Sequence, residues 1–223
     1  MIAGMPIGKR FRDCSFENYE ITRGNRDALD ACKRLTYTLE GGVILSGPVG
    51  TGKTHLMVAL AKAVGGEEPD AEAEEMIEVP SISELIAEAD ASAGEWTPTL
   101  NADEMCVARR VEFWPILDLV DWLRAEATIP PAERVVANRC RTCDLLILDD
   151  FGQERVTEFV FEELERIVDW RYREALPIAI STNMMPSQLA EKYGDRLISR
   201  WIGSCEVVKV QGADYRQRVV VGG

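Results

Sequence analysis

The chain has 223 residues, of which 46% are hydrophobic and 28% are charged, a balance typical of a globular domain long enough to bury a large core. Its net charge of −13 argues against a nucleic-acid partner if the acidic residues are evenly spread. No apolar run approaches the ~18 residues of a membrane-spanning helix, and the first residues contain no signal-peptide core, so we expect a cytoplasmic protein with no membrane partner.

The first predicted elements precede and follow a glycine-rich stretch. A helix over residues 26–40 ends at Gly41-Gly42, because glycine favours the end of a helix. A short apolar strand over residues 43–46 leads into the stretch at 47–54, and an amphipathic helix follows over residues 54–64. This order of strand, glycine-rich turn and helix is the first sign of a ligand site.

Residues 67–108 form an acidic insertion within what we expect to be one domain, residues 1–223. Links from helix to strand usually take 2–6 residues, and this much longer one predicts disorder or a loose helical lobe. Residues 63–108 hold 13 of the 38 acidic residues and no Lys, Arg or His, which leaves 25 acidic against 25 basic residues elsewhere. The remainder is therefore neutral, and the overall charge does not exclude a nucleic-acid partner.

An alternative interpretation gives part of the insertion a place in the sheet. Residues 76–90 resemble residues 110–124, with matching apolar and acidic positions at an offset of 34. They would then form an extra strand–helix unit or the true second strand. We favour residues 110–114 for the second strand, because their spacing to later elements leaves fewer residues unassigned.

Strands and helices alternate beyond the insertion. This alternation predicts a three-layer α/β fold, with a parallel sheet covered by helices on both faces. Ligands in such folds bind at the carboxyl ends of the strands. The expected elements are strands at 110–114, 145–148, 178–181 and 205–210, and helices at 115–127, 130–140, 157–175 and 188–203.

The stretch GPVGTGKT matches the phosphate-binding pattern GxxxxGK[ST] and has the required strand before it and helix after it. Lys53 is expected to reach the β- and γ-phosphates of ATP, and the Thr54 hydroxyl to bind Mg²⁺. His55 closes the predicted nucleotide-contacting segment, although we expect it chiefly to pack on the helix. The backbone cradle comprises Gly47, Pro48, Val49, Gly50, Thr51 and Gly52.

The stretch LLILDD places two carboxylates directly after a buried strand. In P-loop NTPases an acidic residue at such a strand end holds Mg²⁺. We assign that role to Asp149, and assign to Asp150 the orientation or deprotonation of the attacking water. The alternative is a helix N-cap, which explains one aspartate but not two.

Three further polar residues complete the expected site. Asn183 follows the strand at 178–181, where its amide can hydrogen-bond the γ-phosphate or the water; a turn or cap is the alternative. Arg196 and Arg200 share one helix face, and an arginine that stabilises transition-state charge is often supplied by a neighbouring molecule. A surface salt bridge is the alternative for these two.

Together these stretches resemble the AAA+ family, in the branch of DnaC-type helicase loaders and IstB-type transposition helpers. The motifs that carry the resemblance are PIGKRFRDCSFENYE, GPVGTGKTHL, LLILDDFG, LPIAISTN, GDRLISRW and ADYRQRV. The resemblance implies that Lys53 and Thr54 are Walker A residues, and that Asp149 and Asp150 are Walker B residues. The other implied roles are sensor 1 for Asn183, arginine finger for Arg200, sensor 2 for Arg216, and adenine contacts for Phe16 and Tyr19.

The resemblance also implies a function. It predicts an ATPase that loads a replicative helicase onto DNA, forms a homo-oligomer when ATP is bound, and has no helical lid domain after the last strand. Single-stranded DNA is expected to face residues 115–141, where Arg124, Arg134, Arg139 and Arg141 lie; a scatter of surface charges is the alternative. Two alternative functions are a transposition helper that acts with a transposase, and a nucleotide-gated adaptor with little hydrolysis.

Overall fold

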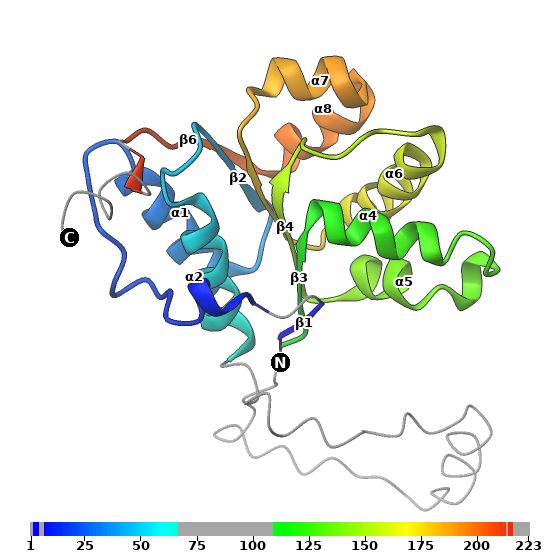
Figure 1. The fold of residues 1–223 in the computed structure, drawn as a ribbon, viewed down its shortest axis with the longest axis horizontal. Helices are drawn as coiled ribbons and strands as arrows, with labels where there is room; N and C mark the ends of the chain where they lie inside the picture. Colours follow the sequence, from blue (N-terminus) through cyan, green and yellow to red (C-terminus); the bar gives the residue numbers. More distant parts are fainter. Residues whose placement is uncertain (1, 5–6, 67–108, 213, 216–223) are drawn as a thin grey trace, which may run out of the picture. The chain divides into compact units, whose positions relative to one another are not determined.

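The computed structural model describes residues 2–4, 7–66, 109–212 and 214–215 (Figure 1). The acidic insertion 67–108, including the alternative unit at residues 76–90, lies outside the described residues. Arg216 also lies outside them. The extent of the insertion and the sensor 2 role of Arg216 therefore stay predictions.

The described residues form a parallel sheet with the strand order β1-β3-β4-β5-β2-β6. This confirms the predicted α/β fold with a parallel sheet. β5, which leads to Asn183, lies between β2, which precedes the glycine-rich loop, and β4, which ends at the two aspartates. The three predicted site segments therefore meet at the carboxyl ends of neighbouring strands. The strands are β1 (Ile2–Gly4), β2 (Gly42–Ser46), β3 (Val111–Pro115), β4 (Leu145–Phe151), β5 (Ile178–Thr182) and β6 (Glu206–Lys209).

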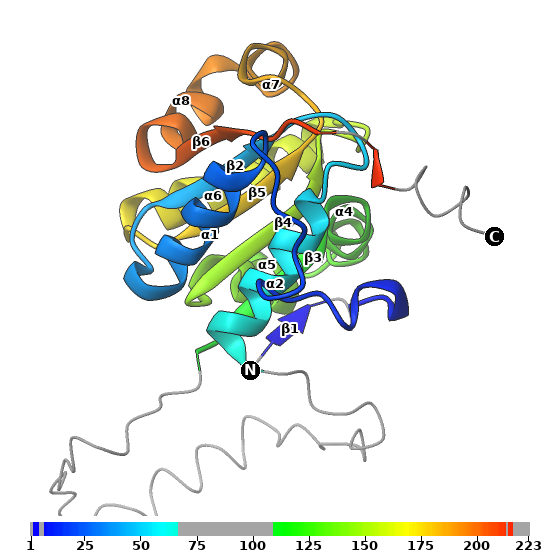
Figure 2. The same ribbon diagram turned by 90° about the vertical axis from the view of Figure 1, so that its left-hand side faces the viewer.

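Helices cover both faces of the sheet, with α1 and α2 on one face and α4, α5 and α6 on the other (Figures 1 and 2). None of the described helices has the length and apolar character needed to cross a bilayer. The α-helices are α1 (Arg26–Thr38), α2 (Lys53–Gly65), α4 (Ile116–Ala125), α5 (Val135–Thr142), α6 (Glu158–Arg173), α7 (Pro186–Tyr193) and α8 (Asp195–Ser204), and the short 3₁₀ helices are η1 (Lys9–Phe11) and η2 (Pro131–Glu133).

The central strand β4 shows why its sequence is apolar without interruption. Leu145 and Ile147 belong to the hydrophobic core under α1 and α2. Leu146 and Leu148 belong to the second core, under α4, α5 and α6. Both faces of the strand are buried, and each fully buried Leu or Ile contributes about 1.5–3 kcal/mol to folding. The strand is therefore a rigid support for the polar residues at its end.

Three features of the fold differ from the prediction. The helix expected over residues 130–140 is the 3₁₀ helix η2 followed by α5, with Arg134 in an extended conformation between them. β1 pairs in parallel with β3 but was not expected, because a strand of three residues gives too short a pattern to detect. The helix expected over residues 188–203 is two helices, α7 and α8, separated at Gly194, which has a φ of 84°. A left-handed backbone conformation of this kind ends a helix and is favourable for glycine.

Candidate nucleotide-binding site

The glycine-rich loop joins β2 to the N-terminus of α2. Gly50 and Gly52 have φ angles of 78° and 89°, which side chains rarely adopt. A Cβ on Gly52 would lie 2.9 Å from the Tyr19 ring. The loop borders a cavity of about 500 Å³. Because the first turn of a helix has free N–H groups and a positive dipole end, the loop is suited to bind phosphate.

Lys53 lies buried at this loop. Its ammonium group donates hydrogen bonds to the backbone oxygens of Gly47 and Pro48, both at 2.7 Å, and to Oδ1 of Asn183 at 2.8 Å. Lys53 and Asn183 both line the cavity. Two residues that are 130 positions apart in the sequence, and that we predicted to act on the same phosphate, therefore touch each other.

The two aspartates at the end of β4 lie in different surroundings. Asp149 is only 5% exposed, and its Oδ1 accepts hydrogen bonds from the Thr54 hydroxyl at 3.3 Å and from the Ser181 hydroxyl. Asp150 has a φ of 55° and lines the cavity. The pairing register between β4 and β5 shifts at this point, between Leu148 and Phe151. Such a bulge redirects a side chain, and it gives the two carboxylates separate positions.

Ser181 connects the two aspartates, and the sequence analysis assigned it no role. Its hydroxyl donates to Asp149 and accepts from the backbone N–H of Asp150 at 2.9 Å. Ser181 is fully buried in β5. The sequence offered only a weak signal, a serine at the end of an apolar strand and two positions before Asn183.

Burial raises the pKa of Asp149 to about 6. The hydrogen bonds from Ser181 and Thr54 lower it, and the nearby charge of Asp150 raises it further. A buried carboxylate of this kind is stabilised by a cation. Mg²⁺ commonly binds through one or two protein ligands, together with substrate phosphates and water. Thr54 and Asp149 fit that arrangement, although the described residues include no group of three or more His, Cys, Asp or Glu that could hold a metal.

This pKa predicts the effect of Asp149→Asn on stability without nucleotide or Mg²⁺. The folded-state pKa of about 6 lies above the ordinary value, so the folded protein binds more protons than the unfolded chain between about pH 4 and pH 6, and the contribution of Asp149 to stability falls as the pH rises through that window. At pH 7.5 the variant should be more stable than the wild type by about 1–3 kcal/mol. Urea denaturation at pH 4, 6 and 7.5 measures this difference.

The matched control for this change is Asp13→Asn, because Asp13 is exposed. The control should show no such gain in the free energy of unfolding over the wild type at pH 7.5. A variant Asp149→Asn that is no more stable than the wild type at pH 7.5 would contradict the assignment of a carboxylate whose charged form is destabilised by burial.

The segment before α1 forms one wall of the cavity. Tyr19 is buried, its hydroxyl donates to the backbone oxygen of Thr51 at 3.5 Å, and its ring meets the His55 ring edge-on with centroids 5.1 Å apart. Burial raises the pKa of the Tyr19 hydroxyl. His55 in turn contacts the backbone oxygen of Ser15 through Nε2 at 2.8 Å. His55, which belongs to α2, therefore connects that helix to the segment before α1, and it also lines the cavity.

Phe16 is placed differently from Tyr19. It packs against the core under α1 and α2, with the Lys33 ammonium 5.9 Å from its ring centre, and it is not part of the cavity lining. Of the two predicted adenine contacts, the structure brings only Tyr19 to the cavity. Phe16 is half-buried and packs against the outside of that core instead.

The end of the described chain also reaches the loop. The Tyr215 N–H donates to the backbone oxygen of Gly50 at 3.0 Å, and the Tyr215 hydroxyl donates to that of Glu20 at 3.3 Å. A Cβ on Gly50 would lie 1.8 Å from Oδ1 of Asp214, so a side chain at this position would require Asp214 to move. Further lining residues that the sequence analysis did not identify are Arg10, Phe11, Cys14, Asn18, Glu20, Gln153 and Tyr215.

Comparison with solved structures identifies the architecture. A DnaC helicase loader matches with a TM-score of 0.67 at 19% identity, over 92% of this chain and 100% of that chain. DnaI matches with a TM-score of 0.61 at 18% identity, over 96% of each chain. The fold is that of the AAA+ P-loop NTPases. No family model and no curated protein sequence matches the chain.

The AAA+ fold is shared with a replication initiator. DnaA bound to AMPPCP and single-stranded DNA matches with a TM-score of 0.64 at 20% identity, over 96% of this chain. Only 54% of that DnaA chain is covered, whereas the two loader chains are covered almost completely. The match therefore extends to the whole of the loader chains but to about half of the initiator.

Arg200 lies on α8 of the AAA+ core and is not part of the cavity lining. Its Nη1 is 2.6 Å from Oδ1 of Asp169 on α6, a distance typical of an ion pair, without the alignment of a hydrogen bond. The side chains of Arg200 and Asp169 are 20% and 31% exposed. Arg196 is 75% exposed and lies 3.7 Å from Glu165. Arg200 is thus half-buried and paired within the chain.

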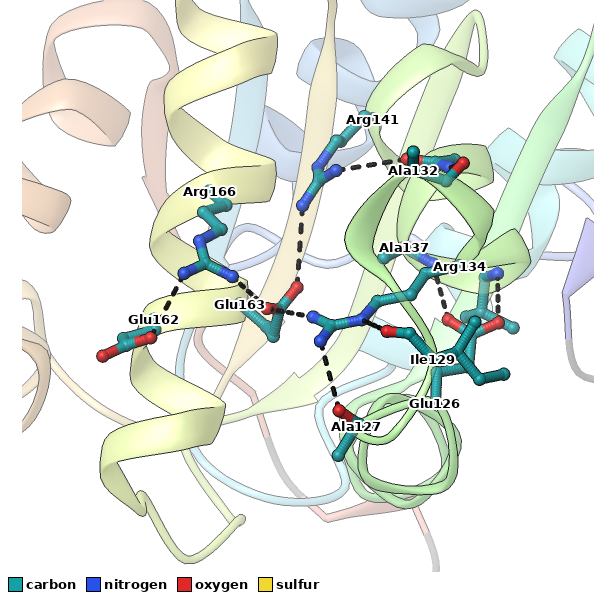
Figure 3. A network of polar contacts seen from close by, with 12 residues as sticks. Glu126, Ala127, Ile129, Ala132, Arg134, Ala137, Arg141, Glu162, Glu163 and Arg166 are labelled. Atoms are coloured by element: carbon teal, nitrogen blue, oxygen red, sulfur yellow. Dashed lines mark hydrogen bonds and ion pairs between the residues drawn. The ribbon is translucent and has the colours of Figure 1, made fainter.

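The arginines predicted to face DNA are engaged within the chain. Figure 3 shows Arg134, Arg141 and Arg166 around the buried Glu163. Arg134 is the most enclosed, with its Nη1 2.5 Å from Oε1 of Glu163 and further hydrogen bonds to the backbone oxygens of Ile129 and Ala127. Leaving a buried charge without its partner costs about 3–5 kcal/mol. Arg134 therefore stabilises the packing of α5 on α6.

The other two predicted arginines also have acidic partners. Arg124 pairs with Asp121 at 3.1 Å, and Arg139 pairs with Glu112 at 2.7 Å. All four arginines therefore have carboxylate partners within the described chain, so the region is not an open groove of unpaired arginines. It is not simply a scatter of surface charges either, because Arg134 is buried. The contact with DNA stays a prediction.

Proposed function

We propose that the chain is an ATP-hydrolysing AAA+ protein that loads a replicative helicase onto DNA. The observation that carries the proposal is the meeting of Lys53, Thr54, Asp149, Asp150 and Asn183 at one edge of the sheet. The fold likeness to the DnaC helicase loader and to DnaI supports the choice of a loader.

Each residue has a role in the proposed reaction. Lys53 binds the β- and γ-phosphates, and Asn183 positions the γ-phosphate or the attacking water. Asp150, which reaches the cavity, orients that water and accepts its proton. Thr54 and Asp149 hold Mg²⁺, which offsets negative charge on the phosphates when it is bound. Tyr19 closes the cavity beside the loop and is the proposed neighbour of the adenine ring.

The proposed partners follow from this cycle. ATP binding brings copies of the chain together, and Arg200 of one copy then acts on the nucleotide of the next. The assembly holds the helicase beside single-stranded DNA, and hydrolysis releases it. Because the charges on α4 and α5 are paired within the chain, we expect the DNA contact to be weak and sensitive to salt.

A loading assay tests the proposal. Closed circular single-stranded DNA is incubated with the host replicative helicase, with ATP, and with or without this protein. We expect the protein to raise the amount of helicase retained on the circle, because a closed helicase ring cannot thread onto a circle that has no end. Linear DNA of the same sequence is the control, since a ring can thread onto its ends unaided.

The result that contradicts the proposal is equal retention with and without the protein. Capture of a transposase rather than the helicase from the host would support the transposition-helper alternative.

A further inference from the structure

The chain turns at the end of β4, and this β4 turn, residues 150–154, forms part of the wall of the nucleotide cavity. Asp150 and Gln153 line the cavity. Asp150 has a φ of 55°, and a residue other than glycine keeps such a conformation only where its surroundings hold it. Ser181 gives one support by accepting the Asp150 N–H. The residues that hold the rest of the turn therefore help to determine where the Asp150 carboxylate points.

Glu154 supports the β4 turn from inside the protein. The residue is 2% exposed. Its Oε2 accepts a hydrogen bond from the Gly152 N–H at 3.0 Å, and its Oε1 accepts one from the Tyr193 hydroxyl on α7. Both donors are uncharged. Because a buried carboxylate is costly compared with an apolar side chain of the same size, stability alone does not explain a glutamate at this position.

Helix α7 holds the same turn through two neighbouring side chains. The Lys192 ammonium donates to the backbone oxygens of Gly152 and, at 2.7 Å, of Glu154. Tyr193 is 1% exposed, and its ring packs on that of Phe151 with centroids 4.7 Å apart. Burial and the contact with Glu154 raise the pKa of the Tyr193 hydroxyl, so it stays protonated and acts as a donor. The turn is thus held by its backbone and by its side chains.

We propose that Glu154 and Tyr193 are positioning residues that hold the β4 turn so that the Asp150 carboxylate faces the nucleotide cavity. This inference rests on the role proposed for Asp150 in hydrolysis. Lys53 and Thr54, which are proposed to bind the phosphates and Mg²⁺, belong to α2 and not to the turn. Loss of the contact between Glu154 and Tyr193 should therefore slow hydrolysis and leave the binding of ATP unchanged.

Two changes at position 154 separate hydrogen bonding from side-chain volume. Glu154→Met loses both acceptors and should lower kcat by about 100-fold, the scale of loss for a misplaced catalytic group, with an unchanged Kd for Mg²⁺-ATP. Glu154→Gln should restore kcat to within a few-fold of the wild type, because its amide oxygen can accept from Gly152 while its NH₂ group donates to the Tyr193 oxygen. Equal slowing in both variants, or slowing explained by weaker ATP binding, would overturn the proposal.

Hydrogen exchange in the full chain without nucleotide tests the support of the turn independently of ATP hydrolysis. In Glu154→Met the backbone N–H groups of residues 150–154 should exchange at least about 10-fold faster than in the wild type, whereas those of α6 should not change. Tyr193→Phe deletes a single oxygen, should change exchange and kcat in the same direction, and decides the matter if Glu154→Met does not fold. Tyr172→Phe, which removes an exposed hydroxyl from α6, is the control and should match the wild type.

The two measurements distinguish failure of this inference from failure of the proposed function. Unchanged exchange in the variants would overturn the inference, and so would faster exchange with a wild-type kcat, which would make the contact merely structural. A wild-type chain that hydrolyses no ATP would instead contradict the proposed function, and the exchange rates would still show whether Glu154 and Tyr193 hold the β4 turn.

Discussion

Arg200→Ala should bind ATP normally and lose hydrolysis by about 10³–10⁵-fold, the usual worth of an arginine that stabilises transition-state charge. The reason is geometric. Lys53, Asp150 and Asn183 are already gathered at the chain's own cavity, whereas Arg200 lies on α8 outside the cavity lining. Arg200 is therefore proposed to act on the nucleotide of a neighbouring copy. Steady-state phosphate release measures the loss.

The ion pair with Asp169 provides the matched control. Asp169→Asn removes the partner of Arg200 but leaves the guanidinium in place. Ion pairs near the surface contribute only about 0–1 kcal/mol, so this variant should fold and keep its ATPase activity within a few-fold of the wild type. If Arg200 serves only the ion pair, the two variants should instead show the same small change in stability and no selective loss of hydrolysis.

Mixing two inactive variants shows whether Arg200 acts between copies. Asp150→Asn retains Arg200 but lacks the carboxylate that we propose orients the attacking water. Arg200→Ala retains that carboxylate but lacks the arginine. At an interface where the first donates its arginine to the second, one complete site forms. Partial recovery of ATPase activity is the expected result. No recovery in mixtures shown to co-assemble would contradict action between copies.

The sequence predicted the parts of the site that depend on local pattern. The glycine-rich loop is contiguous, and Asp149 and Asp150 follow a buried strand directly. The alternation of strands and helices then placed Asn183 at the same edge, because parallel strands present their carboxyl ends together. These predictions required no knowledge of contacts between distant side chains.

The parts that sequence reasoning missed depend on tertiary contacts. The bulge at Asp150 leaves no periodic signal, since β4 is apolar on both faces. The bridge by Ser181 joins residues 32 positions apart. In the sequence Arg134 has no feature that distinguishes it from a surface charge. Its partner Glu163 lies 29 positions later, and only the folded structure brings the two side chains together. Burial of such pairs is decided by how helices pack, which the spacing of charges does not encode.

The central claim is that the cavity at the glycine-rich loop binds ATP through Lys53. Removing the lysine leaves the phosphates without their nearest positive charge, and truncating one member of a buried charged contact costs about 2–5 kcal/mol. Lys53→Ala should therefore weaken Mg²⁺-ATP binding by at least about 30-fold, with the fold retained. Lys33→Ala, which removes an exposed lysine from α1, is the control and should bind as the wild type does.

Isothermal titration of each protein with Mg²⁺-ATP gives the decisive comparison. The account predicts one site per chain in the wild type and in Lys33→Ala, and loss of measurable binding in Lys53→Ala. Wild-type affinity in Lys53→Ala, confirmed as folded by circular dichroism, would contradict it.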